Sequence, residues 1–254
     1  MAAIGDVSFS IQTGCTIGVL GANGSGKSTL ALLLAGLLQP SSGNISFSSP
    51  GGNDESPRSG LLLQNPDNNV IGATVAEDIA FGPVNMGLRP LDVAALVAES
   101  MGSVGVTKLA GRDPATLSEG EKQLVALAGL LAMRPRFLIL DEPTSALDHE
   151  SRARVASAVR GLARGHHMGV VLISQSFEEV LDADVVVILV KGRVEFTGSA
   201  TDALADGEHV RSLGVEPPAL SSVWRQLQTS GHNPFSALAY SHEGAVEELC
   251  RLLS

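Results

Sequence analysis

The fold is decided by one short stretch of sequence, Gly21-Ala22-Asn23-Gly24-Ser25-Gly26-Lys27-Ser28-Thr29. An apolar run from Ile17 to Leu20 precedes it and predicts a buried strand, and the pattern from Thr29 to Leu38 predicts a helix after it. Glycines at this spacing let the backbone curl so that consecutive N–H groups point at one anion. A helix that begins there adds the positive end of its dipole, so the stretch predicts a phosphate-binding loop.

The side chains of this loop fit a nucleoside triphosphate such as ATP. Lys27 can reach the β and γ phosphates, and Ser28 can ligate Mg²⁺. We expect the loop to bind ATP through Gly21, Asn23, Gly24, Ser25, Gly26, Lys27, Ser28 and Thr29. The alternative is a glycine-rich turn that only packs, which is disfavoured because Lys27 and Ser28 are both in register between apolar flanks.

The composition restricts the partners of the chain. A net charge of −10 over 254 residues argues against a nucleic-acid-binding surface, which would need a basic footprint. Two cysteines, Cys15 and Cys250, are too few for a disulfide framework, so we expect a reduced cytosolic setting. The sequence has no apolar run long enough to cross a membrane and no signal peptide, so any membrane role is expected to be peripheral.

The β/α alternation is interrupted in the middle of the chain. Val7 to Ile11 alternates and predicts a half-buried strand, and Leu61 to Leu63 predicts a short buried strand that ends at Gln64. Helices are then predicted from Thr74 to Ala80 and from Leu91 to Met101, separated by Phe81-Gly82-Pro83 and Gly87. A longer helix runs to about Met133, so we expect an inserted helical subdomain at about residues 74–133.

The second half of the chain returns to alternating strands and helices. Strands are predicted at Phe137–Leu140 and Val170–Ile173 on either side of a helix from His149, and a hairpin is predicted around Lys191-Gly192. These elements predict an α/β fold with a mixed sheet core over residues 1–198 and a C-terminal helical extension over residues 199–254.

Two acidic residues follow the buried strand that begins at Phe137. Asp141 at the strand end can hold Mg²⁺ through water, and Glu142 can accept a proton from an attacking water. Alone, these acids could simply be solvated residues at the end of a strand. Beside the phosphate-binding loop, the pattern favours nucleotide hydrolysis.

In family order, these motifs resemble the nucleotide-binding subunit of an ABC transporter, a P-loop NTPase. The matching segments are the Walker A motif Gly21–Thr29, the Q-loop residue Gln64, the signature Leu117–Glu121, the Walker B motif Phe137–Glu142 and the D-loop Ser145–Asp148. The segments Gln64–Asn68, Thr74–Asn85 and Gly214–Pro218 further resemble the energy-coupling-factor (ECF) subgroup, which drives uptake of vitamins and of cobalt or nickel ions.

The resemblance implies an ATPase that works as a head-to-tail pair. Each ATP would lie between one Walker A motif and the partner's signature, represented here by Ser118, Glu119 and Gly120. The Mg²⁺ ligands would be Ser28, Gln64 and Asp141, the catalytic residues Glu142 and Gln175, and the D-loop residue Asp148. A transmembrane coupling subunit would hold the pair at the cytoplasmic face of the membrane.

The sequence departs from the family pattern at several positions. The signature usually reads Leu-Ser-Gly-Gly-Gln, but here it carries Glu119 and Glu121, and Gln175 stands in place of the switch histidine. Cys15 replaces a frequent acid, and the family's adenine-stacking aromatic would lie before Val7, so we expect none in the residues printed here. We expect Glu119 to place a carboxylate close to the partner's γ-phosphate, where like charges repel.

Three alternatives stay open from the sequence. Ser118 and Glu121 also form the S-x-x-E capping box of a helix, and this reading is compatible with phosphate binding. The departures allow a catalytically weakened nucleotide-binding subunit paired with an active ATPase. A soluble ABC ATPase acting on nucleic acid or ribosomes is the third possibility, and the negative net charge argues against it.

Overall fold

The computed structural model describes residues 3–46, 59–64, 71–165, 168–221, 223–224, 240–241, 244–246 and 250–251. The chain divides into two compact units. The phosphate-loop unit comprises Met1–Ile11, Thr16–Leu30 and Val171–Ser254. The helical unit comprises Gln12–Cys15 and Ala31–Val170.

The phosphate-loop unit is built on buried parallel strands. β1 (Thr16–Leu20) pairs in parallel with β5 (Val185–Val190), and Ile17 lies opposite Val185. β5 then turns into the antiparallel strand β6 (Arg193–Gly198). The turn is tight because Lys191 and Gly192 both adopt positive φ, at 48° and 81°. The predicted hairpin is therefore confirmed.

Short helices accompany these strands. α1 (Lys27–Leu34) begins inside the phosphate-binding loop, and a one-turn helix, η4 (Phe177–Val180), follows β4 (Gly169–Ser174). After β6 come α6 (Ala200–Ala205) and α7 (Gly207–Ser212).

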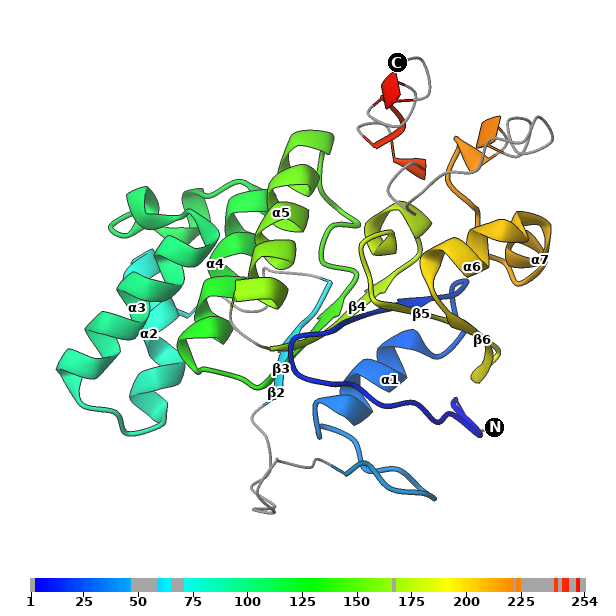
Figure 1. Cartoon of the computed structure of the whole chain (residues 1–254). Helices are drawn as coiled ribbons and strands as arrows, with labels where there is room; N and C mark the ends of the chain where they lie inside the picture. Colours follow the sequence, from blue (N-terminus) through cyan, green and yellow to red (C-terminus); the bar gives the residue numbers. More distant parts are fainter. Residues whose placement is uncertain are drawn as a thin grey trace. The chain divides into compact units, whose positions relative to one another are not determined.

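The helical unit carries a parallel strand pair and four packed helices. β2 (Ser59–Leu62) pairs with β3 (Phe137–Asp141). The helices, seen beside one another in Figure 1, are α2 (Val75–Asn85), α3 (Pro90–Val104), α4 (Glu119–Ala132) and α5 (His149–Gly165). Two one-turn helices, η2 (Thr107–Leu109) and η3 (Pro114–Thr116), connect α3 to α4. The predicted helical insertion between two strands of the α/β fold is thus present.

In the phosphate-loop unit the strand order is β1-β5-β6, and in the helical unit β2 lies beside β3. Parallel and antiparallel pairs occur together, which confirms the predicted mixed α/β sheet. The interiors of β1, β3 and β5 are fully buried, as at Leu20, Leu140 and Ile188, whereas the side chains of β6 alternate between exposed and half-buried. No described helix is long and apolar enough to span a bilayer.

The prediction of a strand from Val7 to Ile11 is wrong. Side chains alternate between half-buried and exposed along this segment, as the sequence pattern implies, but its backbone joins no strand. Alternation of apolar and polar residues indicates an extended segment with one buried side. A β-strand also needs a neighbouring strand to which its backbone is hydrogen-bonded. At other boundaries, α1 ends at Leu34 rather than Leu38, and β2 begins at Ser59 rather than Leu61.

The predicted helix break at Phe81-Gly82-Pro83 is also wrong, because α2 continues to Asn85. Pro83 is buried on the same face as Val75 and Ile79, so packing favours the helix despite the proline. Gly82 permits this packing, because a Cβ there would lie 2.7 Å from the side chain of Met133.

Candidate nucleotide-binding site

The phosphate-binding loop curls around its own lysine. Lys27 is only 5% exposed, and its ammonium donates to the carbonyl oxygens of Gly21 at 2.8 Å and Ala22 at 3.2 Å. A cation held by carbonyl oxygens inside a loop draws the loop into a compact ring. These two contacts tie the position of the Lys27 ammonium to the backbone of the loop.

Glycines give the loop its shape for two different reasons. Gly21, Gly24 and Gly26 all have positive φ, at 158°, 76° and 105°. At Gly21 a Cβ would lie 2.4 Å from the carbonyl oxygen of Leu189, so a side chain is excluded by contact as well as by backbone angle. Gly24 has open space around it, so only its backbone angle calls for glycine.

The loop residues fit a polyphosphate. Ser25 is buried, and its Oγ finds no hydrogen-bond partner among the described residues, an arrangement that suits a ligand oxygen. Ser28 is exposed directly after Lys27, at the start of α1, where first-turn N–H groups have no acceptor inside the helix. Asn23 is exposed and Thr29 is half-buried, so both remain candidates for contact with ATP.

The acids after β3 differ in their surroundings. Asp141 ends the strand and is 5% exposed, whereas Glu142 is half-buried. Glu142 also adopts a left-handed backbone with φ 50°, which is unfavourable for a residue with a side chain. Such strain is tolerated where the surrounding turn fixes the chain, and here it sets the direction in which Glu142 leaves the strand.

Ser145, the first residue of the D-loop, links two predicted site residues. The hydroxyl of Ser145 donates to the carbonyl oxygen of Glu142 at 3.1 Å and accepts a hydrogen bond from Nε2 of Gln64 at 3.1 Å. The backbone N–H of Ser145 donates to the same carbonyl at 3.3 Å. The structure therefore brings Gln64 and Glu142 together through one side chain.

The rest of the D-loop caps α5. Oδ1 of Asp148 accepts from the backbone N–H of Ser151 at 3.0 Å, and this hydrogen bond lowers the pKa of Asp148. Arg152 donates to the carbonyl oxygen of Leu147 at 3.2 Å. Asp148 thus has a structural contact that fixes where the D-loop ends.

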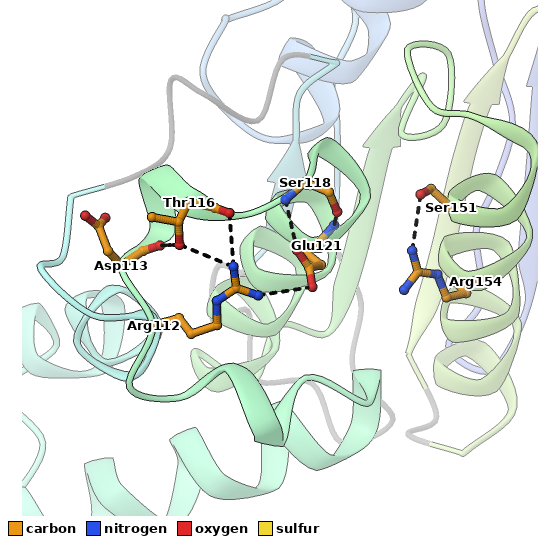
Figure 2. A network of polar contacts seen from close by, with 7 residues as sticks. All are labelled: Arg112, Asp113, Thr116, Ser118, Glu121, Ser151 and Arg154. Carbon is orange, nitrogen blue, oxygen red and sulfur yellow. Dashed lines mark hydrogen bonds and ion pairs between the residues drawn. The ribbon is translucent and has the colours of Figure 1, made fainter.

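The signature serine is the N-cap of α4. Oγ of Ser118 accepts from the N–H of Glu121 at 3.3 Å, while Oε2 of Glu121 accepts from the N–H of Ser118 at 2.9 Å (Figure 2). This reciprocal pair is the capping box predicted from the sequence. Because the Ser118 oxygen acts as the acceptor, its hydroxyl proton can still be donated to a phosphate.

Glu119 is not an isolated charge. Its Oε1 lies 3.1 Å from Nζ of Lys122, and the side chains of Glu119 and Lys122 are 49% and 14% exposed. The ammonium offsets the carboxylate within one helical turn. The repulsion of a bound phosphate that the sequence suggested is correspondingly smaller.

Gly120 lies at a close approach between two helices. A Cβ at this position would lie 2.6 Å from both Cβ and Oγ of Ser151 at the start of α5. Ser151 is 3% exposed and cannot easily move aside. Gly120 therefore allows α4 to pack against α5, whatever it also contributes to nucleotide binding.

The predicted site residues are distributed between the two units. Residues 21–29 and the exposed Gln175 directly after β4 belong to the phosphate-loop unit. Gln64, Ser118, Glu119, Gly120, Asp141, Glu142 and Asp148 belong to the helical unit. Within the described residues no cluster of three or more His, Cys, Asp or Glu side chains forms a metal cage. Magnesium bound with a nucleotide uses few protein ligands, so this finding does not bear on the donors predicted from the sequence, Ser28, Gln64 and Asp141.

Comparison with known proteins agrees with the motifs. The family model described as ABC transporter matches residues 4–145. An energy-coupling factor transporter ATP-binding protein EcfA1 of Symbiobacterium thermophilum is 40% identical over 99% of this chain and 90% of its own length. A cobalt import ATP-binding protein CbiO of Syntrophus aciditrophicus is 38% identical over 91% of this chain and 84% of its own.

Comparison with solved structures agrees with the sequence comparisons. The chain is similar to cbiO1 from Clostridium perfringens, described as part of the ABC transporter complex cbiONQ. The TM-score is 0.74 at 30% sequence identity, and the match covers 88% of this chain and 92% of the other.

Proposed function

Because the chain belongs to the ABC transporter family, we propose that it is the ATP-binding and ATP-hydrolysing subunit of an ECF-type importer. The observation that carries this proposal is the glycine-shaped loop closed around the buried Lys27 between β1 and α1. The cobalt import protein among its relatives supports a transition-metal ion as the cargo, and the resemblance of the sequence to the ECF subgroup keeps a vitamin as the alternative.

In this proposal each group has a distinct role. Lys27 and the loop amides bind the phosphates of ATP, and Ser28, Gln64 and Asp141 hold Mg²⁺. Magnesium, when bound, neutralises charge on the phosphates. The carboxylate of Glu142 accepts a proton from the attacking water. The left-handed backbone of Glu142 fixes the direction in which this side chain extends.

The proposed partners are a second ABC ATPase subunit, identical or homologous, and a transmembrane subunit. Support for the latter comes from exposed apolar residues of the helical unit around α2 and the start of α3: Ile71, Phe81, Val84, Leu88 and Leu91. Leu91 is 85% exposed, which is unusual for a large apolar side chain amid such neighbours. Docking there would place the chain peripherally at the cytoplasmic face of the membrane.

The test is ATP turnover by the purified native complex and by its Glu142→Gln variant. Glutamine keeps the shape of the side chain but cannot take a proton, so we expect turnover to fall about 10²–10⁴-fold while ATP still binds. Unchanged turnover in a preparation free of other ATPases would remove Glu142 from the mechanism. The absence of a membrane protein from the native complex would refute the importer assignment.

A second candidate is a subunit that binds ATP but hydrolyses it slowly beside a more active partner. The observation in its favour is the neutral amide of Gln175 at the end of β4. An amide can donate a hydrogen bond to a phosphate but cannot shuttle a proton as an imidazole can. Faster turnover of the complex with Gln175→His than with the wild-type chain would support this candidate, and unchanged or slower turnover would argue against it.

A further inference from the structure

The start of α2 is tied to the segment that leads into the signature. The backbone N–H of Val75 donates to the carbonyl oxygen of Arg112 at 3.0 Å, and that of Ala76 donates to the carbonyl oxygen of Ala110 at 2.9 Å. First-turn N–H groups have no acceptor inside their own helix. The segment 110–112 therefore serves as part of the N-terminal cap of α2.

The side chain of Arg112 reaches in the other direction, towards α4. One guanidinium nitrogen, Nη2, donates to Thr116, at 3.1 Å to the carbonyl oxygen and 3.4 Å to Oγ1 (Figure 2). The other, Nη1, lies 3.7 Å from Oε1 of Glu121. The planar guanidinium can hold these acceptors at once, whereas an ammonium offers no such fork.

The partner of Arg112 is the residue that closes the cap of the signature helix. Oε2 of Glu121 accepts from the N–H of Ser118. This hydrogen bond, helped by the charges of Arg112 and Arg154, lowers the pKa of Glu121. The carboxylate is therefore ionised at neutral pH and faces a cation on one oxygen and the Ser118 N–H on the other (Figure 2).

We infer that Arg112 is a positioning residue of the signature. Its backbone holds the start of α2, and its side chain holds the Ser118–Glu121 cap of α4. Arg112 therefore fixes the distance between the N-terminal ends of these two helices. The inference rests on the proposed function, in which Ser118 is presented to the ATP of the partner subunit. Without Arg112, Ser118 still caps α4, but its hydroxyl is oriented less tightly.

The effect should appear in catalysis rather than in stability. The Arg112 side chain is 46% exposed, and an exposed ion pair contributes little to folding. Arg112→Ala in the purified complex should raise the KM for ATP about three- to tenfold, the range expected when about one net hydrogen bond is weakened. The affinity of the isolated chain for ATP and its melting temperature should match those of the control.

The matched control is Arg134→Ala. Arg134 is an exposed arginine of the same unit, and its ion pair with Glu99 at 3.1 Å lies beyond the other end of α4. A second variant, Glu121→Gln, keeps an acceptor for the Ser118 N–H but loses the charge. In that background Arg112→Ala should raise KM by a clearly smaller factor, because the negative charge that pairs with Arg112 has been removed.

The outcomes separate the inference from the proposed function. Wild-type complex without ATP turnover would overturn both. Two results beside normal wild-type turnover would overturn the inference alone. One is a KM for ATP in Arg112→Ala equal to that in Arg134→Ala. The other is an effect of Arg112→Ala on KM that is the same with and without Glu121→Gln. If Arg112→Ala does not fold, Arg112→Lys takes its place, because it keeps the cation but not the fork; an unchanged KM in that variant would also overturn the inference.

Discussion

The phosphate-binding loop and the signature segment both precede a helix, yet they are shaped by different forces. The loop is shaped by backbone angles, with three glycines at positive φ and the ammonium of Lys27 on its own carbonyl oxygens. The signature segment is shaped by side chains, through the Ser118–Glu121 box and the guanidinium of Arg112.

This difference suits two different tasks. A loop held by backbone geometry can direct its N–H groups at a ligand, and the buried Oγ of Ser25 adds an oxygen with no partner in the described chain. A segment held by side-chain hydrogen bonds has most of its polar groups engaged before any ligand arrives. The loop is therefore suited to binding ATP, and the signature is suited to being presented rigidly to a second molecule.

The largest effect that tests this comparison is expected from Lys27→Ala. The loop loses the cation that closes it and that meets the phosphates, so ATP affinity should fall about 100-fold or more, since charged hydrogen bonds are worth about 1.5–3 kcal/mol each. Isothermal titration calorimetry measures this change, with the exposed Lys108→Ala as the control. Equal affinities for the two variants would contradict the role of the loop.

On the signature side, Gly120→Ala should destabilise the protein. The added methyl group would lie 2.6 Å from Ser151, so we expect a loss of about 1–3 kcal/mol in the free energy of unfolding, as for other overpacked sites. Glu119→Ala, one residue earlier and exposed, should change it by less than about 0.5 kcal/mol. Urea denaturation without nucleotide gives both values, and similar values would mean that α4 and α5 can separate at little cost.

A smaller effect is expected from Ser145→Ala, which removes the link between Gln64 and Glu142. A net hydrogen bond contributes about 1 kcal/mol, so the KM for ATP should change up to about fivefold in the purified complex. Ser103→Ala deletes a hydroxyl on the exposed face of α3 that donates to the Glu99 carbonyl oxygen, and it should leave KM unchanged. If both serine variants behave alike, the link has no part in turnover.

The smallest effect concerns the pH dependence of the signature cap. Because the Ser118 hydrogen bond lowers the pKa of Glu121 in the folded chain, the cap stabilises the fold fully above the ordinary glutamate pKa of about 4.3. That stabilisation should be lost as the pH falls from there through the lowered pKa. Denaturation of wild-type and Glu121→Gln protein between neutral and acidic pH gives the free energy of unfolding of each. The difference between the two values should become smaller in this pH window, and a constant difference would contradict the prediction.

Local signals in the sequence predicted local structure well. The curled loop around Lys27 and the capping box at Ser118 depend on neighbouring residues, so their patterns are visible in the sequence. The continuation of α2 through Pro83 could not be predicted in this way, because it depends on packing against Met133, which is distant along the chain.

The candidate site shows the same limit. The position of Gln64 at the end of a short strand was predictable, but its hydrogen bond to Ser145 joins residues far apart in the sequence. The Glu119–Lys122 pair, by contrast, has a spacing typical of helices and could have been recognised from the sequence. Whether the assigned residues act on ATP as proposed stays a prediction.

The close approach of Gly120 and Ser151 also bears on how this sequence could diverge. Of the two adjacent glycines in the usual signature, this chain has replaced the first and kept the second. At position 119 the side chain extends into solvent and pairs with Lys122, so a mutation there meets no steric barrier. At position 120 even one carbon atom would collide with the neighbouring helix, so selection for a folded protein suffices to retain glycine there.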